Sequence, residues 1–349
     1  MVMKSEREYT ISFATPAFLG NFQQHGQWRT PPFKAALRYW WRISMSKKHG
    51  YSYCKLRESE KYIFGHASDG SPKKSKIYLR LDRWNEQRKS FQSNEKFEKV
   101  GRGRGISTDL YLGYGPVSPD SKTSNRTYLP NGQTAKLGIR FPSEYEKEIN
   151  EALNLMSWFG TLGSRSRNGW GSLIIDGESI ERFSLINAKP YMRELDKCLE
   201  CDWPHALGMD NGAPLLWEST KQFDAWEDAV NCLAKLKYEM REEAKKHRFD
   251  NSRDELIAGI HLLGYPAGNK WNLRNCDGKR LPSPIRFKII QDESQKYICR
   301  VFHMPTCFPT KFMACLDPQE RNWVKQKQLE IYQKIHQVIE SHSRFDRCK

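Results

Sequence analysis

Cationic and aromatic side chains are concentrated between Phe13 and Arg42, in the sequence FATPAFLGNFQQHGQWRTPPFKAALRYWWR. Chemically they are suited to contacting phosphates and bases, since cations pair with phosphate oxygens and aromatic rings stack on bases. No carboxylate occurs in this stretch. The cations within it are Arg29, Lys34, Arg38 and Arg42.

Lys34, Arg38 and Arg42 follow each other at intervals of four residues, which places them along one stripe of a helix. Like charges on successive turns repel each other, so the stripe is best explained by a polyanionic ligand. The alternative is an ordinary solvated helix face. We expect Trp40 to lie in the core and Trp41, nearer the cations, to contact the ligand.

A second group of such residues forms the glycine-rich sequence GSRSRNGWG at 163–171. Its glycines allow close backbone approach, its arginines can contact phosphates, and its tryptophan can pack or stack; these residues are Gly163, Arg165, Arg167, Gly169, Trp170 and Gly171. The group lies between a predicted helix and a predicted strand. A dinucleotide-binding turn follows a strand and opens a helix, so the order argues against that kind of site.

Residues that could break bonds or hold metal are sparse. His25 could act as a general acid or base with Tyr39 as a helper, but a lone loop histidine is more often a surface or packing residue, and the same holds for His66. Cys198 and Cys201 form one C-x-x-C with His205 nearby, without a second pair to complete a zinc site. We therefore predict no catalytic residue, no metal and no cofactor.

The composition favours a globular nucleic-acid-binding protein. The chain has 349 residues, 57 Lys and Arg against 41 Asp and Glu, and a net charge of +16. Such an excess of positive charge indicates a nucleic acid or an anionic membrane surface as partner. We find no apolar run long enough to span a membrane and no leader sequence, and the nine irregularly spaced cysteines suit a reducing compartment. These features predict a cytoplasmic protein.

The hydrophobic patterns predict strands and helices in the order strand, helix, strand, strand, helix, strand. Thr30 is expected to cap the first helix and Ser143 the second. The predicted strands cover 8–14, 77–81, 135–141 and 172–175, and the helices cover 31–48 and 144–159. This is the order of a ferredoxin-like module, with an irregular insertion at 83–133.

The second half of the chain gives a weaker pattern. Helices are predicted at 223–247 and 318–341, and strands at 285–290 and 297–302. These elements are compatible with a second, degraded copy of the same module. We therefore predict an α+β protein with two fused ferredoxin-like domains, at 1–182 and 183–349.

Several motifs resemble the RAMP superfamily of CRISPR effector proteins. They are FATPAFLG, RTPPFKAALRYWWR, IFG at 63–65 and GSRSRNGWGS, of which the glycine-rich loop is the mark of the superfamily. Within it, LRYWWR and RLPSPI at 280–285 look like the first-numbered subunit of the type III-B Cmr complex.

The resemblance implies a non-catalytic subunit that works in antiviral defence. Such a subunit lies near the 3′ end of the guide RNA, beside another RAMP subunit of the Cmr complex, and holds guide and target RNA. The matching residues are Lys34, Arg38, Arg42, Gly163, Arg165, Arg167, Gly169 and Gly171. Two alternatives stay open: a metal-independent endonuclease that processes guide RNA, with His25 as its acid or base, and a free-standing binder of single-stranded RNA.

Overall fold

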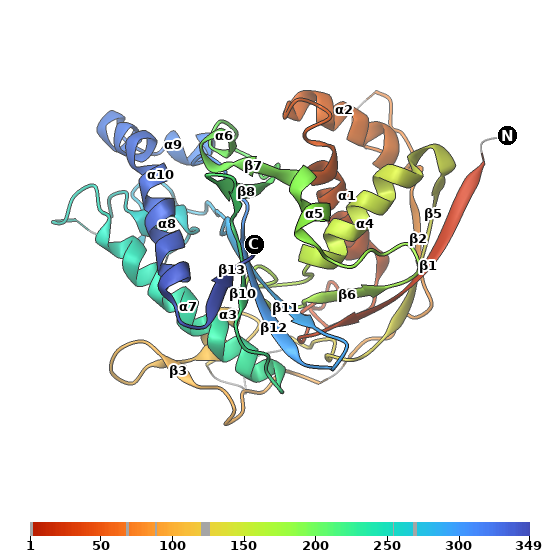
Figure 1. Cartoon of the computed structure of the whole chain (residues 1–349), viewed down its shortest axis with the longest axis horizontal. Helices are drawn as coiled ribbons and strands as arrows, with labels where there is room; N and C mark the ends of the chain where they lie inside the picture. Colours follow the sequence, from red (N-terminus) through yellow and green to blue (C-terminus); the bar gives the residue numbers. More distant parts are fainter. Residues whose placement is uncertain (1–2, 68–69, 88, 120–125, 254, 268–270) are drawn as a thin grey trace. The chain divides into compact units, whose positions relative to one another are not determined.

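The computed structural model describes residues 3–349 except 68–69, 88, 120–125, 254 and 268–270. The chain is an α+β protein that divides into two compact units, drawn in Figure 1. The first unit comprises residues 1–95, 112–191 and 288–297, and the second comprises 96–111, 192–287 and 298–349. Residues 96–111, within the stretch predicted as an insertion, thus belong to the second unit.

The first unit is built on a four-stranded antiparallel sheet with the strand order β2-β5-β1-β6. Its strands are β1 (Lys4–Phe13), β2 (Tyr78–Leu81), β5 (Ala135–Pro142) and β6 (Leu173–Asp176). Apolar residues alternate with polar ones along β1 and β5, so one face of the sheet is buried. Tyr9 is paired with Leu137 and Ile11 with Ala135, all four in the core.

Two helices, α1 (Thr30–Met45) and α4 (Glu146–Phe159), lie side by side against this sheet (Figure 1). Each buries an apolar stripe, which for α1 includes Phe33, Leu37 and Trp40. The other helices of the unit are α2 (Tyr53–Phe64), α5 (Leu185–Ala188) and two 3₁₀ turns, η1 (Ser143–Tyr145) and η2 (Lys189–Tyr191). α3 (Thr108–Gly113) runs from the second unit into the first.

Two details at the helix starts differ from expectation. Thr30 is the first residue of α1, and Arg29 is the N-cap residue without a side-chain cap. Ser143 opens the 3₁₀ turn before α4, where its hydroxyl accepts a hydrogen bond from Ser5 at 2.9 Å. In α1, Pro31 and Pro32 fix φ near the helical value in the first turn, so this helix starts without the predicted cap.

The second unit contains another four-stranded sheet, with the order β11-β12-β10-β13. Its strands are β10 (Leu216–Ser219), β11 (Ile285–Gln291), β12 (Tyr297–His303) and β13 (Phe345–Arg347). Residues 288–297, which comprise the last four residues of β11, the turn after it and the first residue of β12, group with the first unit. The long helices α7 (Trp226–Lys246) and α10 (Pro318–Ser341) pack against each other (Figure 1).

Smaller elements complete the second unit. They are the hairpin of β3 (Lys99–Val100) and β4 (Ile106–Ser107), the sheet of β7 (Met192–Glu194), β8 (Leu207–Asp210) and β9 (Ala213–Pro214), and the short helices α6 (Leu195–Cys198), α8 (Gly259–Leu262) and α9 (Thr310–Met313). Asn231 of α7 holds the hairpin, because its amide bonds the backbone of Lys96 and Glu98. All nine cysteines are free thiols. In the described part of the chain, no helix has the length and apolar character of a membrane span.

Candidate nucleic-acid interface

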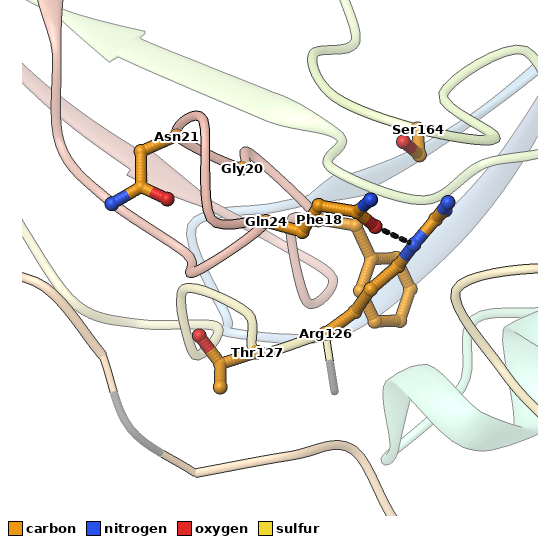
Figure 2. Close-up of a pocket in the computed structure, with 7 residues that line it drawn as sticks. All are labelled: Phe18, Gly20, Asn21, Gln24, Arg126, Thr127 and Ser164. Atoms are coloured by element: carbon orange, nitrogen blue, oxygen red, sulfur yellow. Dashed lines mark hydrogen bonds between the residues drawn. The ribbon is translucent and has the colours of Figure 1, made fainter. Parts of the chain in front are cut away.

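A surface pocket of about 200 Å³ lies in the first unit, where three distant segments meet (Figure 2). The segments are the loop after β1, the chain just before β5, and the glycine-rich loop. The lining residues are Phe18, Gly20, Asn21, Gln24, Arg126, Thr127 and Ser164. The Arg126 Nε donates a hydrogen bond to the Gln24 side-chain oxygen, which holds the guanidinium at the pocket (Figure 2).

The loop that forms one wall of the pocket is held by its own hydrogen bonds. The Asn21 side-chain oxygen accepts from the backbone N–H groups of Gln23 and His25, at 2.9 and 3.0 Å. The Asn21 N–H donates to the His25 carbonyl at 2.9 Å, and the Gly26 N–H donates to the Thr127 hydroxyl at 2.7 Å. These bonds fix the wall of the pocket before any ligand is present.

The glycine-rich loop lies against the backbone of the segment after β1. The Ser164 N–H donates to the Phe18 carbonyl and the Gly171 N–H to the Pro16 carbonyl, both at 3.0 Å. Gly171 has φ +62°, and a Cβ there would be 1.9 Å from the Leu162 carbonyl oxygen. At Gly163, with φ +95°, a Cβ would be 2.8 Å from the Phe18 oxygen. These two glycines are therefore required for close packing of protein backbone.

Two of the predicted phosphate-contacting residues lie together on this loop. Arg165 is exposed, adopts φ +58°, and donates through Nε to the Tyr114 carbonyl at 2.6 Å. Arg167 is half-buried, two residues further along. Arg165 directly follows the pocket residue Ser164, so the glycine-rich loop brings an exposed arginine next in sequence to the pocket wall. Gly169 accepts a hydrogen bond from the buried Thr15 hydroxyl at 2.7 Å and is itself buried.

Trp170 does not lie on this surface. Its ring is buried, with centroid distances of 5.2 Å to both Phe18 and Phe91. Its predicted role as a ligand contact is corrected to a core role, because an aromatic cluster beneath the pocket encloses the indole. That cluster supports the pocket wall at Phe18.

Two cations of the basic stripe on α1 are paired with a carboxylate within the protein. Arg38 and Arg42 both bind the carboxylate of Glu60 on α2, whose side chain is only 4% exposed. Among described residues Lys34 has no carboxylate partner, and burial together with the charge of Arg38 lowers its pKa. Arg29 is half-buried at the start of the helix. The stripe therefore serves the packing of α1 on α2 at two of its three positions.

Trp41 is buried as well as Trp40, which corrects the prediction that Trp41 contacts the ligand. The Trp41 ring packs edge-on against Phe64 of α2, with centroids 5.7 Å apart, and its indole N–H donates to Glu148 at 3.3 Å. Trp40 packs on Phe159 of α4. α1 thus buries two sides, because α2, a helix that the sequence patterns did not predict, covers the second.

The candidate catalytic and metal-binding residues are engaged elsewhere. The His25 ring lies 3.7 Å from the Glu86 carboxylate, Tyr39 packs edge-on against Trp40, and His66 bridges to the Lys73 backbone. The two ring nitrogens of His205 bond the Trp203 carbonyl and the Arg193 guanidinium, at 2.8 and 2.9 Å. Residues in the described ranges form no cluster of three or more potential metal ligands.

Arg126, Gln24 and Ser164 are site residues that the sequence analysis did not identify. Arg126 lies in the predicted irregular insertion, where no hydrophobic period predicts a position. It reaches the pocket because Leu129 pairs with Ala17 through two backbone hydrogen bonds of 2.9 Å. The one signal that could have located Ser164 was its place beside Arg165 in the glycine-rich loop.

The part of the chain that carries the glycine-rich loop matches a known protein family. Residues 11–174, which contain β2, β5 and the whole loop, match the family model described as the RAMP superfamily. Over this part of its length the chain is similar to the RAMP superfamily.

One solved structure is similar to this chain over nearly the whole of its length. The apo crystal structure of Cmr1 from Pyrococcus furiosus is similar with a TM-score of 0.51 at 16% identity, covering 93% of this chain and 97% of that one. At this identity the similarity establishes a shared fold.

Two cryo-EM structures of the type III-B Cmr-beta complex also match at 12% identity. One, bound to cognate target RNA, has a TM-score of 0.49 and covers 93% of this chain and all of that chain. The other, bound to cognate target RNA and AMPPnP in the presence of ssDNA, has a TM-score of 0.46 and covers 95% and 100%. A search with the sequence finds no significant match among curated proteins.

Proposed function

We propose that this chain is a non-catalytic, RNA-binding subunit of a type III-B CRISPR effector complex. In this role it holds the 3′ region of the guide RNA and the facing target RNA in antiviral defence, beside other RAMP subunits of the Cmr complex. The match of residues 11–174 to the RAMP superfamily model and the fold shared with Cmr1 support the assignment. The net charge of +16 fits a polyanionic partner.

The observation that carries the proposal is a braced pocket that Arg126 lines and whose residue Ser164 is followed directly by the exposed Arg165. Cations held by hydrogen bonds at a concave surface can contact successive phosphates without first losing much side-chain entropy. The arginines reach this surface from different segments, so the fold brings them together. This surface replaces the α1 stripe as the main candidate for RNA contact.

We further assign a ferredoxin-like module to each unit. The strand order β2-β5-β1-β6, with α1 after the first strand and α4 after the third, supports this assignment for the first unit. In the second unit, β10, β11, β12 and β13 repeat the same relative order, with α7 and α10 in the equivalent connections. Two such modules fit the paired domains that the sequence predicts.

Recovery of the tagged chain from its native cell tests the proposal. Guide RNA and sibling RAMP subunits should be retained with the wild-type chain and depleted when Arg126 and Arg165 are both changed to Ala. Recovery of the wild-type chain alone, free of RNA and of siblings, would contradict the assignment.

The second candidate is an RNA-processing endonuclease, and one observation favours it: His25 directly follows the pocket residue Gln24, and its Nδ1 lies 3.7 Å from the Glu86 carboxylate. Incubation of the pure protein with labelled repeat RNA separates the two. Our proposal expects intact RNA, whereas a discrete cut that His25→Ala abolishes would establish the nuclease.

A further inference from the structure

Phe22 projects from the loop that walls the pocket, and its side chain is 89% exposed. No other large hydrophobic side chain of the described residues is more exposed. It lies between the pocket residues Asn21 and Gln24. A phenyl ring in water forgoes the stabilisation that burial would give, so a ring held out in this way is a candidate contact for a ligand.

The backbone on both sides of Phe22 is fixed. The Gln24 N–H donates to the Asn21 carbonyl at 3.0 Å and closes the turn, and the Asn21 amide donates to the Glu86 carboxylate at 2.6 Å. Gln24 adopts φ +66°, a conformation that its contact with Arg126 helps to hold. The exposed ring is therefore presented by a rigid turn, which reduces the entropy lost when a ligand covers it.

Two arginines belong to the segments that form the pocket. Arg126 lines the pocket and bonds Gln24 of the same loop, and Arg165 directly follows the pocket residue Ser164. Arg165 also bonds the carbonyl of Tyr114, a second aromatic residue, whose side chain is 61% exposed. Exposed rings next to guanidinium groups are the combination with which proteins bind single-stranded nucleic acid, since rings take the bases and cations take the phosphates.

We propose that Phe22 is a stacking platform for an unpaired RNA base whose flanking phosphates contact Arg126 and Arg165. The inference rests on the proposed RNA-binding function and adds the mode of recognition. Every base has a face that can stack, so this contact does not select sequence. A partner protein is a poorer occupant, because a stable protein interface needs a larger apolar centre than one ring among cations and polar groups.

The test uses the full-length protein and a single-stranded oligoadenosine that carries one 2-aminopurine. Stacking of this base changes its fluorescence, and anisotropy of the labelled RNA gives the affinity. Phe22→Ala should weaken binding about 5- to 150-fold, the range for loss of one base–aromatic stack. The salt dependence should stay that of the wild type, because no phosphate contact is lost. Phe22→Trp should keep the affinity within about twofold.

Ile186 of α5 is the matched control, since its side chain is 84% exposed in the same unit and Ile186→Ala also removes an exposed apolar group. It should leave the affinity and the fluorescence unchanged.

If wild-type protein binds the probe and Phe22→Ala binds it equally, with the same 2-aminopurine signal, the inference is overturned while the proposed function stands. Loss of sibling subunits from Phe22→Ala without a change in RNA affinity overturns it in favour of a protein contact. If wild-type protein does not bind the probe, the proposed function itself fails.

Discussion

Arg42 donates two hydrogen bonds to one carboxylate oxygen of Glu60, from Nε at 2.8 Å and from a terminal nitrogen at 2.7 Å. Arg38 contacts the same oxygen from one turn earlier on α1. Glu60 lies on α2, so this triad joins the two helices. A nearly buried carboxylate is tolerated only when cations or donors satisfy it, and here two guanidinium groups do so.

Glu60→Ala should lower the free energy of unfolding by about 2 to 3 kcal/mol, because charged hydrogen bonds are lost and two half-buried guanidinium groups are left unpaired. Urea denaturation measures the change. Glu58→Ala is the matched control on the same helix. The Glu58 side chain is 71% exposed and pairs only with Lys61 in the salt bridges of the described residues, so its loss should leave the midpoint unchanged. Equal midpoints for both variants would contradict a structural role for the triad.

Gly171→Ala should destabilise the first unit by about 2 to 4 kcal/mol, from the left-handed φ and from overlap with the Leu162 carbonyl oxygen. Gly132→Ala separates the two causes. Gly132 has φ +75°, but a Cβ there would meet nothing within 4 Å, so about 1 kcal/mol is expected. Thermal unfolding of the two variants provides the comparison, and similar losses would show that close packing at Gly171 is unimportant.

The main helices and the central strands could be predicted from the sequence because their periodicity is long enough to detect. α10 begins and ends where predicted, at Pro318 and Ser341, and the α+β class is confirmed. β10 and β13 were missed. They have four and three residues, and β10 is sandwiched between β12 and β13, partners distant in the chain, so local alternation carried almost no signal.

The candidate site was only partly predictable for a related reason. Arg165 was found because the glycine-rich loop is a local pattern. Glu60 pairs with cations on α1 only because α2 folds back onto α1, and the sequence patterns predicted no helix at α2. Without that helix, Trp41 was placed on the surface. Whether the cations of the stripe are paired within the protein therefore depends on a tertiary contact, which the residues of α1 alone do not indicate.

The second unit should lose stability in mild acid. His303 and His336 are buried and share a hydrogen bond of 2.9 Å; burial lowers the pKa of His336 to about 3 and holds that of His303 well below its ordinary value. In the unfolded chain both rings take up protons below about pH 6.5, whereas in the folded state both rings stay unprotonated. The unfolded state then binds more protons, so stability is full above pH 6.5 and falls as the pH drops towards 3.

Each ring contributes a loss of about 1.4 kcal/mol per pH unit in that window. Denaturation of the wild type at pH 7.5 and at pH 5.5 measures the summed loss of stability from both rings. His336→Phe removes one of the two titrating rings. The difference in the free energy of unfolding between pH 7.5 and pH 5.5 should therefore shrink by the contribution of one ring. The comparison is made within each variant, which removes any general loss of stability. If His336→Phe showed the same loss of stability between pH 7.5 and pH 5.5 as the wild type, the buried histidine pair would not be the cause of that loss.

Arginines that bind RNA and arginines that stabilise the fold should respond differently to substitution by Ala. Arg165→Ala should weaken binding of a single-stranded RNA for every sequence tested. It should also reduce the slope of log affinity against log salt by about 0.7, the share of one phosphate contact on a single strand. Unfolding of this variant should match the wild type, because Arg165 is exposed.

Arg42→Ala should do the opposite, with lower stability and an unchanged salt slope, because its guanidinium is committed to Glu60. Salt titrations by fluorescence anisotropy, paired with urea denaturation of both variants, provide the measurement. If Arg42→Ala flattened the salt slope and Arg165→Ala did not, the RNA surface would lie along α1, and the pocket beside the glycine-rich loop would be excluded as the main site.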